Sequence, residues 1–209
     1  ASPFAKLIYE EQLIVGINNS LDLGFGDDVT WETITSDPIA MASIASNSLI
    51  MDEIVASSVL SDMVLASSIA MTAIANSTTA LTSVFASWAM REKIWNDASA
   101  SAILMDSNNA SRNWMMTNQS QVTSINNGGN TSSEVSATQL SKKCFVLSYR
   151  LRYAGGATIY GAYGNPKSAT TKSATAVAQS SRVSPLVAYL RNSSTNNNYV
   201  YVTYVQMQQ

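Results

Sequence analysis

A ten-residue repeat across residues 39–118 constrains the fold of this chain more than any other feature. Steps of ten from Ile44 give the apolar column Ile44, Ile54, Val64, Ile74, Val84, Ile94, Leu104 and Trp114. A second column contains Met41, Met51, Met71 and Leu81. Within a repeat the apolar positions lie three or four residues apart, which is the spacing of one helix face and not the alternation of a strand. The repeats are therefore predicted to be helical.

No strong helix breaker interrupts the repeats, because glycine is absent from residues 42–127 and proline from residues 39–164. Asp37 followed by Pro38 offers an N-cap and a proline at the first helical position. At 3.6 residues per turn, ten residues fall roughly 80° short of three turns, so a persistent stripe predicts a left-handed supercoil. We therefore expect a fibrous α + β protein whose long coiled-coil shaft would measure about 120 Å.

The partner of this stripe is expected to be the same chain. A lone helix would leave its apolar stripe in water, and no short connection folds the helix back on itself. The expected assembly is a homotrimer. Its core would be formed by Met41, Ile44, Met51, Ile54, Val64, Met71, Ile74, Leu81, Val84 and Ile94. The alternative is a single-chain solenoid, in which each Ser-Ser pair caps a short helix and each repeat forms one rung.

Four segments are expected along the chain: an N-terminal module (1–37), the helical shaft (38–118), a polar neck or linker (119–141) and a small antiparallel β-domain (142–209). In the last segment, residues 145–153 alternate between apolar and polar, which predicts a strand with one buried and one solvated face. Further strands are expected at residues 158–160, 183–190 and 199–205. No transmembrane helix is expected, because Ser, Asp or Thr interrupts every repeat.

Charge is segregated along the chain. Residues 1–37 carry seven acidic residues against Lys6, whereas residues 142–209 carry eight Lys or Arg and no acid. Tyrosine rings stack on sugars, and cations favour phosphate or carboxylate groups. The residues predicted to bind a receptor are Arg150, Arg152, Tyr153, Tyr160, Tyr163, Lys167 and Lys172.

The sequence offers little for catalysis. It has no histidine and one cysteine, Cys144, so the common Ser-His-Asp, Cys-His and zinc sites lack their residues. Residues 142–209 have no carboxylate to act as a general acid or base. No nucleic-acid-binding motif is recognisable. We expect no enzymatic activity, no cofactor and no metal.

The repeat Ile69-Ala-Met-Thr-Ala-Ile-Ala-Asn-Ser-Thr78, the segment Cys144-Phe-Val-Leu-Ser-Tyr149 and the final strand from Tyr199 to Val205 resemble tailed-bacteriophage fibre proteins. The resemblance covers roughly the last four-fifths of the chain. It implies a trimeric fibre on the exposed surface of the phage particle, with an N-terminal virion anchor, a helical shaft and a distal β-domain.

The expected function is therefore that of a non-enzymatic phage fibre, which attaches to host surface polysaccharide through its basic β tip. Residues 1–37 would bind another virion protein, and neither nucleic acid nor membrane insertion is expected. The alternative is a structural or decoration fibre, or a spacer of the head, collar or tail, whose β-domain clamps a trimer. A scaffold outside any virus is a third possibility.

Overall fold

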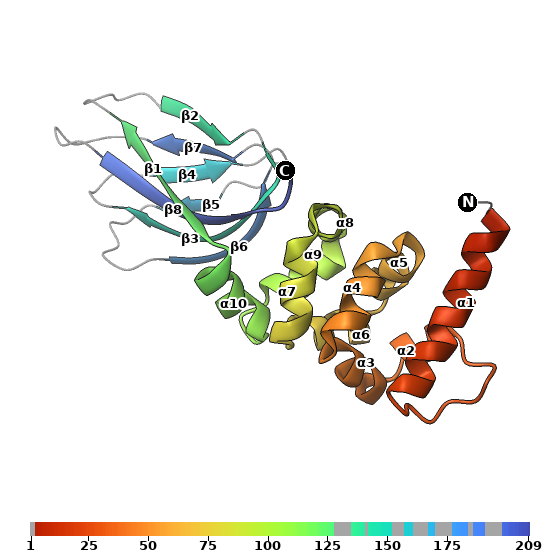
Figure 1. Ribbon diagram of the computed structural model, residues 1–209. Helices are drawn as coiled ribbons and strands as arrows, with labels where there is room; N and C mark the ends of the chain where they lie inside the picture. The colour runs from red at the N-terminus through yellow and green to blue at the C-terminus, as the bar shows by residue number, and fades with distance from the viewer. Residues whose placement is uncertain are drawn as a thin grey trace. The chain divides into compact units, whose positions relative to one another are not determined.

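The computed structural model describes residues 3–127, 135–140, 142–151, 157–160, 167–169, 177–183, 186–190 and 198–209. The chain divides into two compact units, Ala1–Ser111 and Arg112–Gln209. Helices form the first unit and β-strands most of the second (Figure 1).

The described residues contain ten helices. They are α1 (Pro3–Ser20), α2 (Trp31–Thr35), α3 (Pro38–Ala45), α4 (Ser48–Ala56), α5 (Ser58–Ala66), α6 (Ser68–Ala75), α7 (Thr78–Ala86), α8 (Trp88–Asn96), α9 (Ala98–Met105) and α10 (Ala110–Asn118). From α3 to α9 each ten-residue repeat forms one helix of eight or nine residues.

A capping residue separates each of these helices from the one before it. The N-caps recur every ten residues: Asp37, Asn47, Ser57, Ser67, Ser77, Ser87 and Asp97. Each has extended backbone, and its side-chain oxygen accepts a hydrogen bond from the backbone N–H three residues on. Such side chains satisfy the first amides of a helix and compete with continuation of the preceding one.

The short helices stack with a period of three. The chain bends by 98° between α3 and α4, and by the same angle between α5 and α6. Three helices later the chain returns to the same side, so that α3 packs on α6, α4 on α7 and α6 on α9. One turn of this solenoid therefore takes about 30 residues.

Polar side chains also connect successive turns. Ser67 Oγ donates to the Thr35 carbonyl at 2.6 Å, and Ser77 Oγ donates to the Ala45 carbonyl at 2.5 Å. Lys93 Nζ reaches back from α8 to α5, where it contacts Asp62 Oδ1 at 2.6 Å. Each bond joins residues 31 or 32 apart, which is one turn of the solenoid.

The predicted coiled-coil shaft is wrong. The helices are short, bent and packed on one another within one chain. All ten residues predicted to form a trimer core are completely buried inside this single chain: Met41, Ile44, Met51, Ile54, Val64, Met71, Ile74, Leu81, Val84 and Ile94. The helical period was correct, but Ser, Asn and Asp side chains end the helices without help from glycine or proline.

Arg91 occupies a position in the methionine column and keeps its charge out of the core. Its guanidinium lies 4.2 Å from the centre of the Trp88 ring and 5.1 Å from that of Phe85. Arg91 Nε donates to the Phe85 carbonyl at 2.8 Å. Partial burial lowers the pKa of Arg91. The stacked ring and the carbonyl compensate for the water that this guanidinium loses.

The second unit contains two four-stranded antiparallel sheets among the described residues. Its strands are β1 (Gln121–Asn127), β2 (Val135–Leu140), β3 (Cys144–Leu151), β4 (Ala157–Tyr160), β5 (Lys167–Ala169), β6 (Val177–Val183), β7 (Leu186–Leu190) and β8 (Asn198–Gln206). The strand orders are β1-β8-β3-β6 and β2-β7-β4-β5. β1 and β2 lie in the range 119–141 that was predicted to be a neck or linker.

β3 differs from the predicted half-solvated strand, because Cys144 through Ser148 are all buried. It is a central strand, paired with β8 on one side and β6 on the other. Both ladders skip Leu147, whose carbonyl instead accepts a hydrogen bond from Arg112 Nη2 at 2.5 Å. Because neighbouring residues of a strand point to opposite faces, burial of all five means that both faces of β3 are covered there.

Within the described residues no single helix is both long and apolar enough to cross a membrane. Two bent pairs, α3 with α4 and α5 with α6, meet that length and composition only when taken together.

Candidate functional site

Three of the seven residues predicted to bind a receptor lie on strands that the structure describes. Arg150 lies on β3 of the first sheet, whereas Tyr160 lies on β4 and Lys167 on β5 of the second sheet. The other four predicted residues, Arg152, Tyr153, Tyr163 and Lys172, lie outside the described residues. Their predicted role stays a prediction.

Charge divides between the two units more sharply than the overall value of −2 suggests. Ala1–Ser111 holds 13 acidic and 3 basic residues, which gives −10. Arg112–Gln209 holds 1 acidic and 9 basic residues, which gives +8. Partners of the two units are therefore expected to differ in charge.

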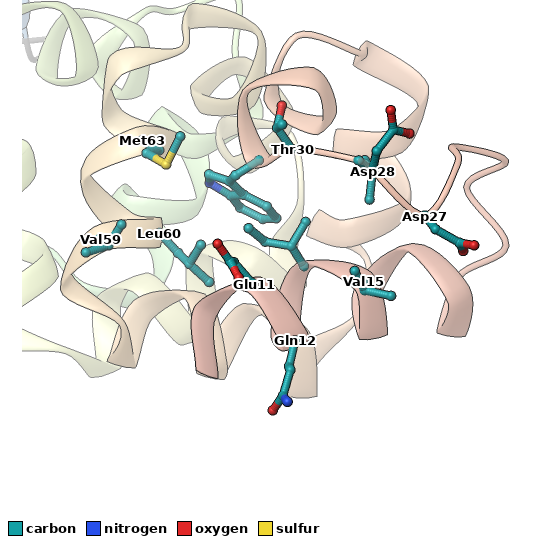
Figure 2. A pocket seen from close by; sticks show the side chains of 12 residues that line it. Glu11, Gln12, Val15, Asp27, Asp28, Thr30, Val59, Leu60 and Met63 are labelled. Atoms are coloured by element: carbon teal, nitrogen blue, oxygen red, sulfur yellow. The ribbon is translucent and has the colours of Figure 1, made fainter. Parts of the chain in front are cut away.

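A pocket of about 680 Å³ lies between the C-terminal half of α1, the segment 27–31 and α5; we call it the N-terminal pocket. Its lining is mainly apolar and includes Ile14, Val15, Val29, Trp31, Leu60 and Met63. Figure 2 shows these elements around the pocket, with Glu11 pointing toward the middle of the group, whereas Gln12 and Asp27 point outward.

Asn18 holds one wall of this pocket in place. Its side-chain Nδ2 donates to the Phe25 carbonyl at 2.9 Å, and the Phe25 N–H donates to Asn18 Oδ1 at 3.2 Å. Gly24, with a φ of +78°, supplies the left-handed turn that this loop needs. Thr30 then caps α2, which starts at Trp31. The loop is thus fixed to α1 at one end and to the solenoid at the other.

Trp31 is the unusual residue of the lining. It is 1% exposed, and its indole Nε1–H has no hydrogen-bond partner among the described residues. Buried donors are nearly always paired, so this nitrogen is an exception; it is shielded by the atoms packed around it and is not accessible from the pocket. The sequence showed Trp31 only as an aromatic residue ahead of the repeats.

The charged lining residues of the pocket are all acidic and exposed. Glu11, Asp27 and Asp28 contribute carboxylates, and neither lysine nor arginine is among the lining residues. Across the described part of the chain, no three His, Cys, Asp or Glu side chains are grouped so as to hold a metal ion. The pocket is suited to binding an apolar group that carries a positive charge.

A second pocket of about 400 Å³ lies beside α2, α5 and α6, and includes Glu32, Ser67 and Ile69. Ile69 occupies the same place in α6 that Val59 occupies in α5, two residues after the N-cap. The side chains are similarly exposed, at 38% and 40%. Ile69 therefore offers a matched control for changes at Val59, which lines the N-terminal pocket.

No model of a known protein family matches this chain, and no curated protein is significantly similar to it.

Proposed function

We propose that this chain is a non-enzymatic structural protein of a phage virion, in which the solenoid is a spacer and the β-unit contacts the host surface. The observation that carries the proposal is the capped, stacked repeat. Each helix is joined to its neighbour one turn away by packing and by hydrogen bonds such as that from Ser77 to Ala45. Solenoids of this kind present surfaces and set distances through repetition.

The basic charge of the second unit supports the attachment role. Nine Lys or Arg against one acid favour an anionic partner, and phosphate- or carboxylate-bearing surface polysaccharide has that chemistry. The resemblance of the ten-residue repeats to phage fibre proteins supports the virion location.

The test uses purified full-length chain and antibodies raised against it. Immunogold labelling of phage particles is expected to decorate the virion, and fluorescently labelled chain is expected to bind host cells at low salt and to be released at high salt. Virions without label would overturn the proposal and favour a scaffold outside any virus.

A spacer or decoration role without attachment is the second candidate. It is favoured by the stacked repeat itself, which can set a distance without a binding site of its own. Virions that lack the chain and still adsorb to host cells at the normal rate would establish this second role. A loss of adsorption would support attachment.

A further inference from the structure

We propose that the second unit binds an anionic sugar residue on the outer face of the sheet β1-β8-β3-β6, around Tyr199, Tyr201 and Arg150. We call this surface the tyrosine–arginine face. The inference rests on the proposed function, because it names the site and the ligand chemistry through which the β-unit would contact the host surface.

The strand pairing winds the second unit as a jelly roll. β1 pairs with β8, β2 with β7, β3 with β6 and β4 with β5, which is the pairing of one long hairpin folded over on itself. The strand orders β1-β8-β3-β6 and β2-β7-β4-β5 follow from this winding. A jelly roll packs two such sheets against each other, so each sheet has one inner and one outer face.

Burial along β8 distinguishes the two faces of the first sheet. Val202 and Tyr204 are buried, whereas Tyr201 and Thr203 are half-buried. Val122, which lies opposite Thr203 on β1, is 64% exposed. Since successive residues of a strand point to opposite sides of the sheet, Tyr201 and Thr203 lie on the outer face.

One end of this outer face is covered. Phe145 and Val205 lie opposite each other on the same side of the sheet as the half-buried residues of β8, and both are completely buried. At that end Arg112 of α10 donates a hydrogen bond to the Leu147 carbonyl. The open part of the face therefore lies toward the other end of β8, at Tyr199.

Aromatic and cationic residues meet at the open end. Arg150 on β3 lies directly opposite Tyr201, and Tyr199 lies two residues away along β8, so the three share one face at spacings of about 5 Å and 7 Å. Tyrosine rings stack on sugar rings, and a guanidinium binds a carboxylate or phosphate through two parallel hydrogen bonds. Ser124 and Asn126 of β1 share this face and offer hydrogen-bonding groups for sugar hydroxyls.

The described strands of the second sheet lack this combination. Tyr189 of β7 lies opposite Thr158 of β4. Lys167 is the one Lys or Arg in these strands, and it lies opposite Ile159, which is on the other face from Thr158. Tyr189 therefore has no cation in register on its own face and serves as a matched control for Tyr201.

The test is a titration of ¹⁵N-labelled full-length chain with three sugars, followed through its backbone amide resonances. Trigalacturonic acid supplies carboxylates, glucose 6-phosphate supplies a phosphate, and maltotriose is the uncharged control. We expect saturable shifts on β1, β3 and β8 with at least one charged sugar, and affinity lower by about tenfold or more with maltotriose. The charged sugar that binds more tightly distinguishes a carboxylate ligand from a phosphate ligand.

Matched variants test the face itself. Tyr201→Ala should weaken binding of the charged sugar about three- to tenfold, whereas Tyr189→Ala should leave it unchanged. Arg150→Gln should weaken binding about tenfold or more, because a charge-assisted contact is lost. Lys142→Gln removes an equal charge just before β3 and should change the affinity by less than about twofold. The same spectra show whether each variant is folded.

The proposal would be overturned by the absence of saturable shifts with both charged sugars, by equal affinity for maltotriose, or by equal losses in Tyr201→Ala and Tyr189→Ala. Binding of host cells by the labelled variants separates this proposal from the proposed function. Cell binding that persists in Tyr201→Ala and Arg150→Gln would overturn the site and leave attachment standing. A wild-type chain that binds the charged sugars but no host cell would overturn attachment alone.

Discussion

Ser77 illustrates how one small side chain acts on two turns of the solenoid. Its Oγ accepts the Ala80 N–H at 3.2 Å, which caps α7, and donates to the Ala45 carbonyl at 2.5 Å, at the end of α3. Ser67 makes the equivalent pair of bonds to Ala70 and Thr35. A hydroxyl can both accept and donate, so serine at this position satisfies two backbone groups at once.

Replacing Ser77 by alanine is expected to lower the free energy of unfolding by about 1–3 kcal/mol, because a cap is lost and a carbonyl loses its donor. Urea unfolding followed by circular dichroism would measure the change. Ser68→Ala is the control, since Ser68 is exposed at the first position of α6, and should change the stability by less than about 0.5 kcal/mol. Equal effects at both positions would contradict the double role of Ser77.

Cys144 should be unreactive in the folded chain. Its side chain is completely buried at the start of β3, and burial raises the pKa of its thiol from 9.0 to about 12. We expect iodoacetamide to modify it at mildly alkaline pH only after unfolding, as measured by mass spectrometry. Modification of the native chain as fast as of the chain in urea would contradict this.

The raised pKa of the Cys144 thiol also makes the stability of the folded chain depend on pH. The folded state favours the protonated thiol, so the contribution of Cys144 to stability is complete below the ordinary pKa of 9.0 and is lost as the pH rises toward about 12. A Cys144→Ala variant should show a weaker fall in stability over that range.

At the scale of the elements, stability must come from packing between helices. Helices of eight or nine residues are marginal in isolation. From α3 to α9 each helix buries between two and five residues, and α6 buries Ala70, Met71, Ile74 and Ala75. Removal of one buried side chain should therefore weaken the packing between two successive turns of the solenoid.

Ile74→Ala is expected to cost about 2–5 kcal/mol, because Ile74 is completely buried and alanine would leave a cavity. Ile39→Ala is the matched control, since Ile39 is 78% exposed on α3, and should cost less than about 0.5 kcal/mol. Thermal and urea unfolding of both variants would provide the comparison. Similar losses would mean that Ile39 is buried by a partner in solution.

Much of the helical unit could be predicted from the sequence, but not its connectivity. The apolar columns, the helical period and the capping role of Asp37 were all visible. The column from Asn47 to Asp97 was equally visible, and it consists entirely of N-cap residues. The absence of glycine and proline suggested a continuous helix, whereas these polar side chains divide it.

The β-strands were predictable only where they were apolar. The predicted strand at residues 199–205 lies within β8, whereas Gln121–Asn127 is so polar that it resembled a linker. β1 becomes a strand because it pairs with β8, about 80 residues further along the chain. The composition of residues 121–127 alone cannot indicate that this segment pairs with a distant strand.

The N-terminal pocket was beyond the reach of the sequence for the same reason. It assembles side chains from α1, the segment 27–31 and α5, which are brought together by the first turns of the solenoid. In the sequence nothing connects Glu11 with Trp31, and only the fold places both in the lining of the N-terminal pocket.

At the scale of the whole molecule, burial within one chain changes the expectation for assembly. The columns that were predicted to join three copies are already covered in one copy. A trimer stays a prediction, but the solenoid core does not require it.

We therefore expect the unfolding midpoint of the helical signal to be independent of protein concentration. A core shared between copies would make this midpoint rise with concentration, because association would then be coupled to folding. Circular dichroism over a wide concentration range, with light scattering to compare the mass with 22.4 kDa, would measure both properties. A midpoint that climbs with concentration would restore a role for neighbouring copies in the core.

The three-helix turn also limits how the number of repeats in the solenoid can change. Excising a single decad would rotate every later helix onto the adjoining side, and pairs such as Lys93 with Asp62 would no longer face each other. Excising three consecutive decads would remove one whole layer and return each remaining helix to its former side. Length variants that still fold should therefore differ by multiples of about thirty residues, which is one complete turn of the solenoid.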